Sequence, residues 1–233
     1  MMPNLEQFDP GWHLRTATRR AKSDVANKLV SMFLHMLSRT LCEAWQLKTE
    51  NESYLAKVQE VFGDRCPYCR TVLNKTNVIV EHPDGMNRLR AGLHVPGNVL
   101  LACKPCNGEK RRDDSLRTLV LAETGWESFL SHDGTYCDPL CRSCAYWKRL
   151  WPDLDQRKAE LQQNAARIRQ FRAIYPEFER VLPYLKEHLP HYLAILYTDC
   201  QTFADSRIES LMREFLQKAP IIADPPASLG TDA

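Results

Sequence analysis

The sequence predicts an α+β fold that is mostly α-helical, with a small β-β-α unit between two helical regions. Three observations support this prediction: apolar residues recur at helical spacing on both sides of the middle of the chain, the middle holds a β-branched run, and two Cys-x-x-Cys pairs flank that run. We expect an N-terminal helical region over residues 1–60, the β-β-α unit over 61–122, a C-terminal helical region over 123–218 and a flexible tail over 219–233.

The N-terminal region is expected to contain a helix that starts at the N-cap pair Ser23-Asp24. Apolar residues then recur at the spacing of one helix face, which we expect to be buried. These residues are Val25, Leu29, Phe33, Met36, Leu37, Leu41 and Trp45.

The middle region changes character. The β-branched run at 76–80 and the turn residues at 83–85 and 96–97 predict a β-hairpin with a long connection. After Cys106 the polar and apolar residues follow the spacing of a helix, which we expect to continue through Val120. Together these elements form the predicted β-β-α unit.

The C-terminal region is expected to be a helical array. A helix is predicted over 154–174, and further apolar segments follow it. Pro176, Pro183 and Pro190 are expected to separate these segments, because proline breaks a helix interior.

Composition limits the class of protein. The chain has 233 residues, of which 44% are hydrophobic and 26% charged, as in a folded protein, and no run approaches the roughly 18 apolar residues of a membrane span. The N-terminus lacks the features of a secretory signal, so we expect a cytoplasmic protein. The net charge is only +2, but residues 61–117 carry ten Lys/Arg against six Asp/Glu. Positive charge is therefore concentrated in the middle region.

Nine cysteines in a reducing compartment point to metal binding rather than disulfides. Cys66-Pro-Tyr-Cys69 and Cys103-Lys-Pro-Cys106 are two pairs separated by 33 residues, and each can place two thiolates on one tetrahedral ion. Four protein ligands leave no open position for water or substrate. The sequence thus predicts a structural Zn²⁺ that staples the β-β-α unit.

Polar residues with catalytic potential lie between the two pairs and just after them. A neutral imidazole at His82 can accept a proton from water, and the carboxylate of Glu81 is a hard ligand for Mg²⁺ or Mn²⁺. On a strand these two side chains point to opposite faces, so one centre requires the strand to end or bulge there. Asn107 follows the last thiol, and its amide oxygen is the expected second protein ligand of the catalytic ion.

Three motifs together resemble a known family: Glu81-His82-Pro83, Pro96-Gly97-Asn98-Val99 and Cys103-Lys-Pro-Cys106-Asn107-Gly-Glu-Lys110. They are similar to the HNH endonuclease family in its four-cysteine variant, over roughly a quarter of the chain. The resemblance implies a ββα-metal centre that cuts DNA to leave 5′-phosphate and 3′-hydroxyl ends. It also implies that Asn98 is a positioning residue of the site, and Asn107 the third letter of the motif. Glu81 departs from the Asp common in the family.

Several cationic side chains are candidates for contact with nucleic acid. Lys110 and Arg111 share a helix face with Asn107 and are expected to bind phosphates near a helix N-terminus. His94 is a further candidate for phosphate or metal contact, with the alternative that it contacts neither. The helix at 154–174 carries cations that either track a DNA backbone or face solvent: Arg157, Lys158, Arg167, Arg169 and Arg172.

A third cysteine cluster comprises Cys137, Cys141 and Cys144. One interpretation is a second zinc site whose fourth ligand is His132, Cys42 or Cys200; the other is a set of partly buried thiols beside Tyr146, Trp147 and Trp151.

The function expected from these residues is metal-dependent hydrolysis of DNA phosphodiester bonds, with His82 as general base. A restriction enzyme acting on double-stranded DNA is the first expectation, and the long helical flanks offer surface for recognition and for a homodimer. The alternative is a zinc-dependent DNA-binding module without catalysis, which would not need His82, Glu81 and Asn107.

Overall fold

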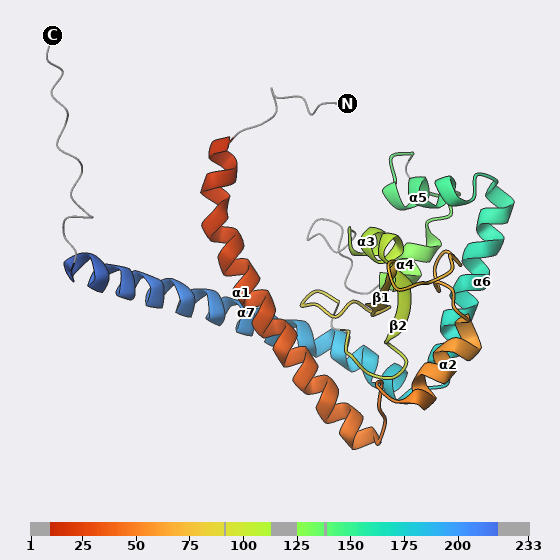
Figure 1. Cartoon of the computed structure of the whole chain (residues 1–233), viewed down its shortest axis with the longest axis horizontal. Helices are drawn as coiled ribbons and strands as arrows, with labels where there is room; N and C mark the ends of the chain where they lie inside the picture. Colours follow the sequence, from red (N-terminus) through yellow and green to blue (C-terminus); the bar gives the residue numbers. More distant parts are fainter. Residues whose placement is uncertain (1–9, 91, 113–124, 138, 219–233) are drawn as a thin grey trace, which may run out of the picture. The chain divides into compact units, whose positions relative to one another are not determined.

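The computed structural model describes residues 10–90, 92–112, 125–137 and 139–218, with side chains from residue 21 on except those of 111 and 112 (Figure 1). The elements are α1 (Pro10–Trp45), α2 (Glu52–Phe62), β1 (Val78–Glu81), β2 (Leu100–Cys103), α3 (Lys104–Arg112), α4 (Gly125–Ser131), α5 (Arg142–Leu150), α6 (Leu154–Ala173) and α7 (Pro176–Lys218). The predicted mostly helical α+β class is confirmed. The tail at 219–233 lies outside the described residues.

Contacts divide the chain into two compact units. Unit 2 is continuous, from Val30 to Ala194, and contains the sheet and the core. Unit 1 combines residues up to Leu29 with those from Ile195 onward, where Lys22 and Asp205 form an ion pair. The predicted boundaries along the sequence stay predictions. Among the described helices, none is both long and apolar enough to cross a membrane.

Helix α1 begins at Pro10, so Ser23 and Asp24 lie inside it and the predicted start was wrong. Proline suits the first turn of a helix, where its missing N–H would be unpaired in any case. Seven of the twelve residues at 11–22 are alanine, leucine, arginine or lysine, which favour the helix. An N-cap pair marks the start of a helix only when the residues before it cannot themselves be helical.

The predicted buried face of α1 was also wrong, by one residue around the helix, although its last members Leu37, Leu41 and Trp45 are half-buried. Val25, Leu29, Phe33 and Met36 are exposed, whereas the buried residues are Ala26, Val30, Leu34 and Ser38. The Ser38 hydroxyl donates to the carbonyl oxygen of Leu34 (2.6 Å) and accepts from the backbone N–H of His94 (2.9 Å). Because its polar group is satisfied, this face can be buried although its side chains are smaller.

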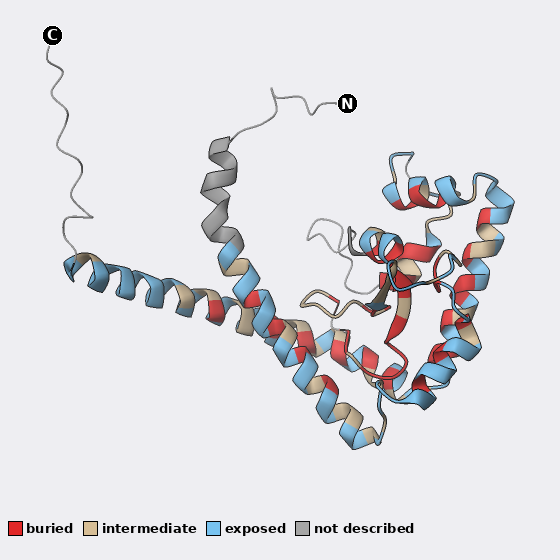
Figure 2. Ribbon diagram, viewed as in Figure 1, coloured by how far each residue is buried: buried red, intermediate tan, exposed pale blue. Residues whose placement is uncertain are grey.

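The core of unit 2 lies where α2 and α6 pack together beside the sheet. Asn51 caps α2 and Asp153 caps α6, each through its side-chain oxygen. The Phe171 ring lies 5.9 Å from that of Tyr54 and 5.5 Å from that of Phe62, between ring centres. Figure 2 shows buried residues gathered on β2 and along α2 and α6.

The predicted hairpin is present as β1 and β2, which pair antiparallel with Val78 opposite Cys103 and Glu81 opposite Leu100. Residues 82–99 form the long connection, and α3 follows β2 without a gap. The predicted extension of this helix to Val120 falls beyond the described residues. The Tyr54 hydroxyl donates to the carbonyl oxygen of Val99 (2.6 Å), so α2 fixes the entry to β2.

The predicted helix at 154–174 is confirmed as α6, and Pro176 separates it from α7 as predicted, but the later prolines do not divide the chain. Pro183 and Pro190 lie inside the continuous helix α7. An interior proline costs a helix about 3 kcal/mol or more. Burial offsets this cost, since the first part of α7 places on one buried face Phe178, Leu182, Leu185, Leu189 and Leu193.

Candidate functional site

The four predicted thiols come together. The sulfur atoms of Cys66, Cys69, Cys103 and Cys106 all lie within 4.8 Å of one another, and those of Cys69 and Cys103 are 3.6 Å apart. In a tetrahedral site with zinc–sulfur bonds of about 2.3 Å, sulfur atoms are about 3.8 Å apart. The cluster can therefore hold a structural metal such as zinc.

Local backbone geometry builds the two Cys-x-x-Cys turns. The first closes through a bond from the N–H of Arg70 to the carbonyl oxygen of Cys66 (3.0 Å), with Arg70 in the left-handed region at φ 61°. The second spans the end of β2 and the first turn of α3, where the N–H of Cys103 donates to the Cys66 sulfur (3.4 Å). The sheet and α3 thus bring the two turns together.

Glu81, which is 2% exposed, is held by one residue of the first turn and by one residue of α3. From the first turn, the Tyr68 hydroxyl donates to Glu81 Oε1 (3.1 Å). From the helix that follows the second, Lys110 Nζ lies 2.7 Å from the same oxygen. Burial and the Glu81 charge raise the pKa of Tyr68 well above its usual value, so Tyr68 remains a donor. Tyr68 was not among the predicted site residues.

Lys110 is buried rather than free for a phosphate. Besides Glu81, its ammonium donates to the carbonyl oxygens of His82 (2.8 Å) and Pro83 (3.1 Å). Three acceptors match its three N–H donors, so Lys110 holds the end of β1 against α3. The predicted phosphate contact would require Lys110 to give up one of these bonds. Arg111 lies in α3, but its side chain is outside the described part of the structure.

His82 follows the last residue of β1, so the strand ends where a common centre for Glu81 and His82 requires it. Its Nε2 lies 3.0 Å from Nδ1 of His94. Burial, followed by the charges that His94, Lys110 and His35 can carry, lowers the pKa of His82 to about 3. His82 is therefore neutral at neutral pH.

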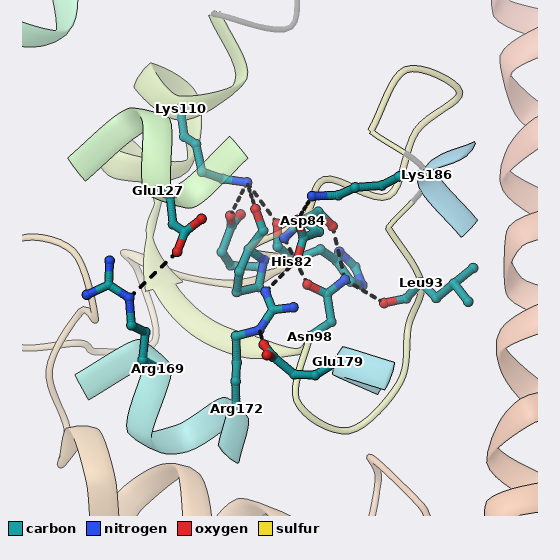
Figure 3. Close-up of polar contacts among 12 residues, drawn as sticks. His82, Asp84, Leu93, Asn98, Lys110, Glu127, Arg169, Arg172, Glu179 and Lys186 are labelled. Atoms are coloured by element: carbon teal, nitrogen blue, oxygen red, sulfur yellow. Dashed lines mark hydrogen bonds and ion pairs between the residues drawn. The ribbon is translucent and has the colours of Figure 1, made fainter. Parts of the chain in front are cut away.

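Asn98 joins the two ends of the connection between the strands. Its amide oxygen accepts from the backbone N–H of Asp84 (2.8 Å), and its Nδ2 donates to the carbonyl oxygens of Asp84 (3.0 Å) and Leu93 (2.8 Å). It is fully buried. These contacts are those that a positioning residue requires, and Figure 3 shows them beside Lys110.

One pocket of about 280 Å³ brings most of the predicted residues together. Glu81, His82, Asn107 and Lys110 all line it, and His35 of α1 adds a second imidazole. Asn98 supports the pocket without lining it. His35 and His94 also line a larger neighbouring pocket of about 670 Å³ along the end of α1.

An ion-pair network that was not predicted joins the connection to α6 and α7 (Figure 3). Nη1 of Arg172 is 2.5 Å from Asp84 Oδ2, and its Nε is 2.6 Å from Glu179 Oε1. Lys186 Nζ is 3.4 Å from the other Asp84 oxygen. Arg172 and Asp84 are 2% and 1% exposed. Because Asp84 also bonds Asn98, the network fixes the segment after His82 to α6 and α7.

Arg172→Met is expected to lower the free energy of unfolding by about 3–5 kcal/mol, since it leaves the buried Asp84 carboxylate without its main partner. Urea denaturation followed by circular dichroism measures the change. Arg169→Met is the matched control on the same helix: Arg169 pairs at 3.6 Å with Glu127 in an exposed position, so its loss should cost no more than about 1 kcal/mol. Equal effects of the two substitutions would refute the role given to Arg172.

Two cations of α6 fit neither of the interpretations left open by the sequence, which were contact with DNA and exposure to solvent. Arg157 and Arg172 are buried in the protein, so neither tracks a nucleic acid backbone. Arg157 donates to the carbonyl oxygens of Asp133 (2.6 Å) and Trp151 (2.8 Å). Arg169 is exposed.

The third cysteine cluster gains a fourth member. His132 lies with Cys137, Cys141 and Cys144, and the four ligand atoms are all within 4.8 Å of one another. Of the three candidates for the fourth ligand, the structure selects His132 over Cys42 and Cys200. This cluster too can hold a structural metal such as zinc.

Comparison of the chain with models of known protein families, with curated proteins and with solved structures gives no match to any of them. The function is therefore argued from the site.

Proposed function

We propose that the protein is a zinc-stapled, metal-dependent endonuclease that hydrolyses DNA phosphodiester bonds, as its resemblance to the HNH family implies. The observation that carries the proposal is the single pocket shared by His82, Glu81 and Asn107, which lie at the end of β1 and the start of α3. The four-thiol cluster, as a Zn²⁺ site, joins these two elements and fixes the pocket.

His82 supplies the general base. If its Nε2–H donates to Nδ1 of His94, then Nδ1 of His82 keeps a lone pair that accepts a proton from water. The backbone N–H of His94 is held by Ser38, so α1 positions the partner of the base. An anionic phosphodiester in the pocket would raise the pKa of His82 from its low value in the free protein.

The donor set fits a hard divalent cation. Glu81 brings a carboxylate and Asn107 an amide oxygen to the same pocket, and oxygen ligands are those that Mg²⁺ and Mn²⁺ prefer. Such an ion, when bound, neutralises phosphate charge and stabilises the leaving oxyanion. The two contacts of Glu81 with Tyr68 and Lys110 both use Oε1, and they hold the carboxylate in place.

Several finer points belong to the proposal. Double-stranded DNA, 5′-phosphate ends and Asn98 as positioning residue come from the family resemblance, and a restriction role, a cytoplasmic location and a homodimer come from the sequence. The second candidate function is a DNA-binding module without catalysis. The Lys110–Glu81 ion pair favours this alternative, because a buried pair of this kind can serve the fold alone, without any catalytic role.

Incubation of the protein with supercoiled plasmid tests the proposal. We expect nicked and linear products with Mg²⁺ or Mn²⁺, none with EDTA, and recovery when Mg²⁺ is added back in excess after a brief EDTA treatment that leaves the zinc in place. Single-stranded DNA and RNA of the same sequence serve as alternative substrates. Binding to all of these without cleavage, in either metal, would leave the binding module as the function.

A further inference from the structure

We propose that His132, Cys137, Cys141 and Cys144 bind a second structural zinc ion, independent of the proposed nuclease centre. All four are half-buried, and they lie in and around the connection between α4 and α5. Three thiolates and one imidazole form a closed tetrahedral set, so the ion would have no open position for substrate. Its role would be structural.

The geometry fits this assignment. Nδ1 of His132 lies 3.2 Å from the Cys137 sulfur and 3.3 Å from the Cys141 sulfur. In a tetrahedral zinc site the nitrogen and sulfur atoms are about 3.5 Å apart, so a shift of a few tenths of an ångström admits the ion. Cys141 is the N-cap of α5, and Cys144 lies in its first turn. A helix N-terminus favours thiolates, the form that binds zinc.

Apolar packing is sparse among the described residues of this connection. Tyr136 and Leu140, its large apolar residues, are 98% and 89% exposed, so they contribute no core. Two polar contacts anchor it: the bond from Arg157 to the Asp133 carbonyl, and a turn in which the Asp133 carboxylate accepts from the N–H of Thr135 (2.7 Å). A metal ion compensates for the absence of apolar packing in such short segments.

The second ion would also support the first cluster. It fixes the start of α5, and α5 places Trp147 in the core, where its Nε1 donates to the carbonyl oxygen of Phe129 (2.9 Å). One residue earlier, the Tyr146 hydroxyl lies 3.1 Å from the Cys106 sulfur. When Cys106 is a thiolate, this hydroxyl is its hydrogen-bond donor. Helix α5 thus links the two metal sites.

Metal content per chain tests the proposal. The purified wild-type protein, prepared under reducing conditions, should contain two zinc ions by plasma mass spectrometry, and Cys141→Ser should contain one. Cys200→Ser, which alters a buried thiol outside both clusters, is the matched control and should keep two. One zinc in the folded wild-type protein would overturn the proposal, and so would two in Cys141→Ser.

His132→Cys covers the case in which Cys141→Ser does not fold, because this variant keeps four ligands. With Co²⁺ in place of zinc, the wild-type protein should give the summed absorption of a four-sulfur and a three-sulfur, one-nitrogen site. His132→Cys should still bind two ions, with the spectrum shifted to that of two four-sulfur sites. An unchanged spectrum would exclude His132 as a ligand. Neither readout depends on DNA cleavage.

Discussion

Cys103→Ser is expected to remove the metal from the first cluster and with it the folded state of unit 2. Zinc bound to four protein ligands contributes about 10–16 kcal/mol of apparent binding free energy, which is as large as the total stability of about 5–15 kcal/mol for a typical protein. Cys103 is buried at the end of β2 and pairs with Val78 of β1. Loss of the ion there would release both the sheet and the start of α3.

Thermal unfolding followed by circular dichroism, together with zinc content, measures this effect. Cys103→Ser should lack the cooperative transition of the wild-type protein, whereas Cys42→Ser, at a half-buried thiol outside both clusters, should keep it. A Cys103→Ser protein that melts like the wild type would show that the sheet and core hold together without the ion. A cysteine cluster without metal would then be the better description.

The parts of the fold that the sequence predicts are those fixed by local constraints. Two Cys-x-x-Cys turns, a β-branched run and a helix directly after the last thiol leave few ways to arrange β1, β2 and α3 if all four sulfur atoms are to meet at one place. That arrangement also fixes the positions of Asn107 and of the end of β1. The sequence could therefore predict that these residues lie close together without information about the flanking helices.

Contacts made by distant elements were not predictable in the same way. Asp84 and Arg172 are 88 residues apart, and neither position looks unusual in isolation. One signal was nevertheless present: Arg172 stands on the apolar face of α6, four residues after Ile168 and eleven after Leu161, both buried. Helix periodicity therefore indicated that the Arg172 side chain is buried, although its charge alone suggested that it faces solvent. A buried charge needs a partner of opposite charge.

His94 and Tyr68 show a second limit. His94 is one of several polar residues in a long connection, and the contact of its backbone with Ser38 of α1 helps to hold it beside His82. Tyr68 lies inside the first Cys-x-x-Cys turn. The cysteine spacing predicts the turn but does not indicate a role for the residues between the cysteines. In the proposed site both would be positioning residues, whose roles depend on tertiary contacts.

The errors in α1 and α7 share a physical cause. A buried face was assigned from the largest apolar residues and helix ends from capping residues and prolines, whereas packing in unit 2 selects Leu34 with Ser38 and carries α7 through Pro183. Local preferences of about 1–3 kcal/mol are smaller than the sum of the buried contacts along a long helix.

His82→Ala is expected to lower the rate of DNA cleavage by about 10²–10⁴-fold, the usual contribution of a general base. The fold should survive, because the contact that Lys110 makes at this position is with the backbone oxygen of His82, which alanine keeps. DNA affinity should change little, since the base acts on water rather than on the phosphate. Cleavage of labelled DNA under single-turnover conditions, with binding measured separately, distinguishes the two effects.

Two further substitutions test whether the expected loss of cleavage rate is specific to the pocket. His188→Ala changes a partly exposed imidazole on α7 and should cleave DNA at the wild-type rate. His94→Ala removes the partner of Nε2 while leaving the base, so we expect a smaller loss of about 10–100-fold, the cost of a misaligned catalytic group. If His82→Ala cleaved as fast as His188→Ala, water would be activated elsewhere, and the pocket between β1 and α3 would have no catalytic role.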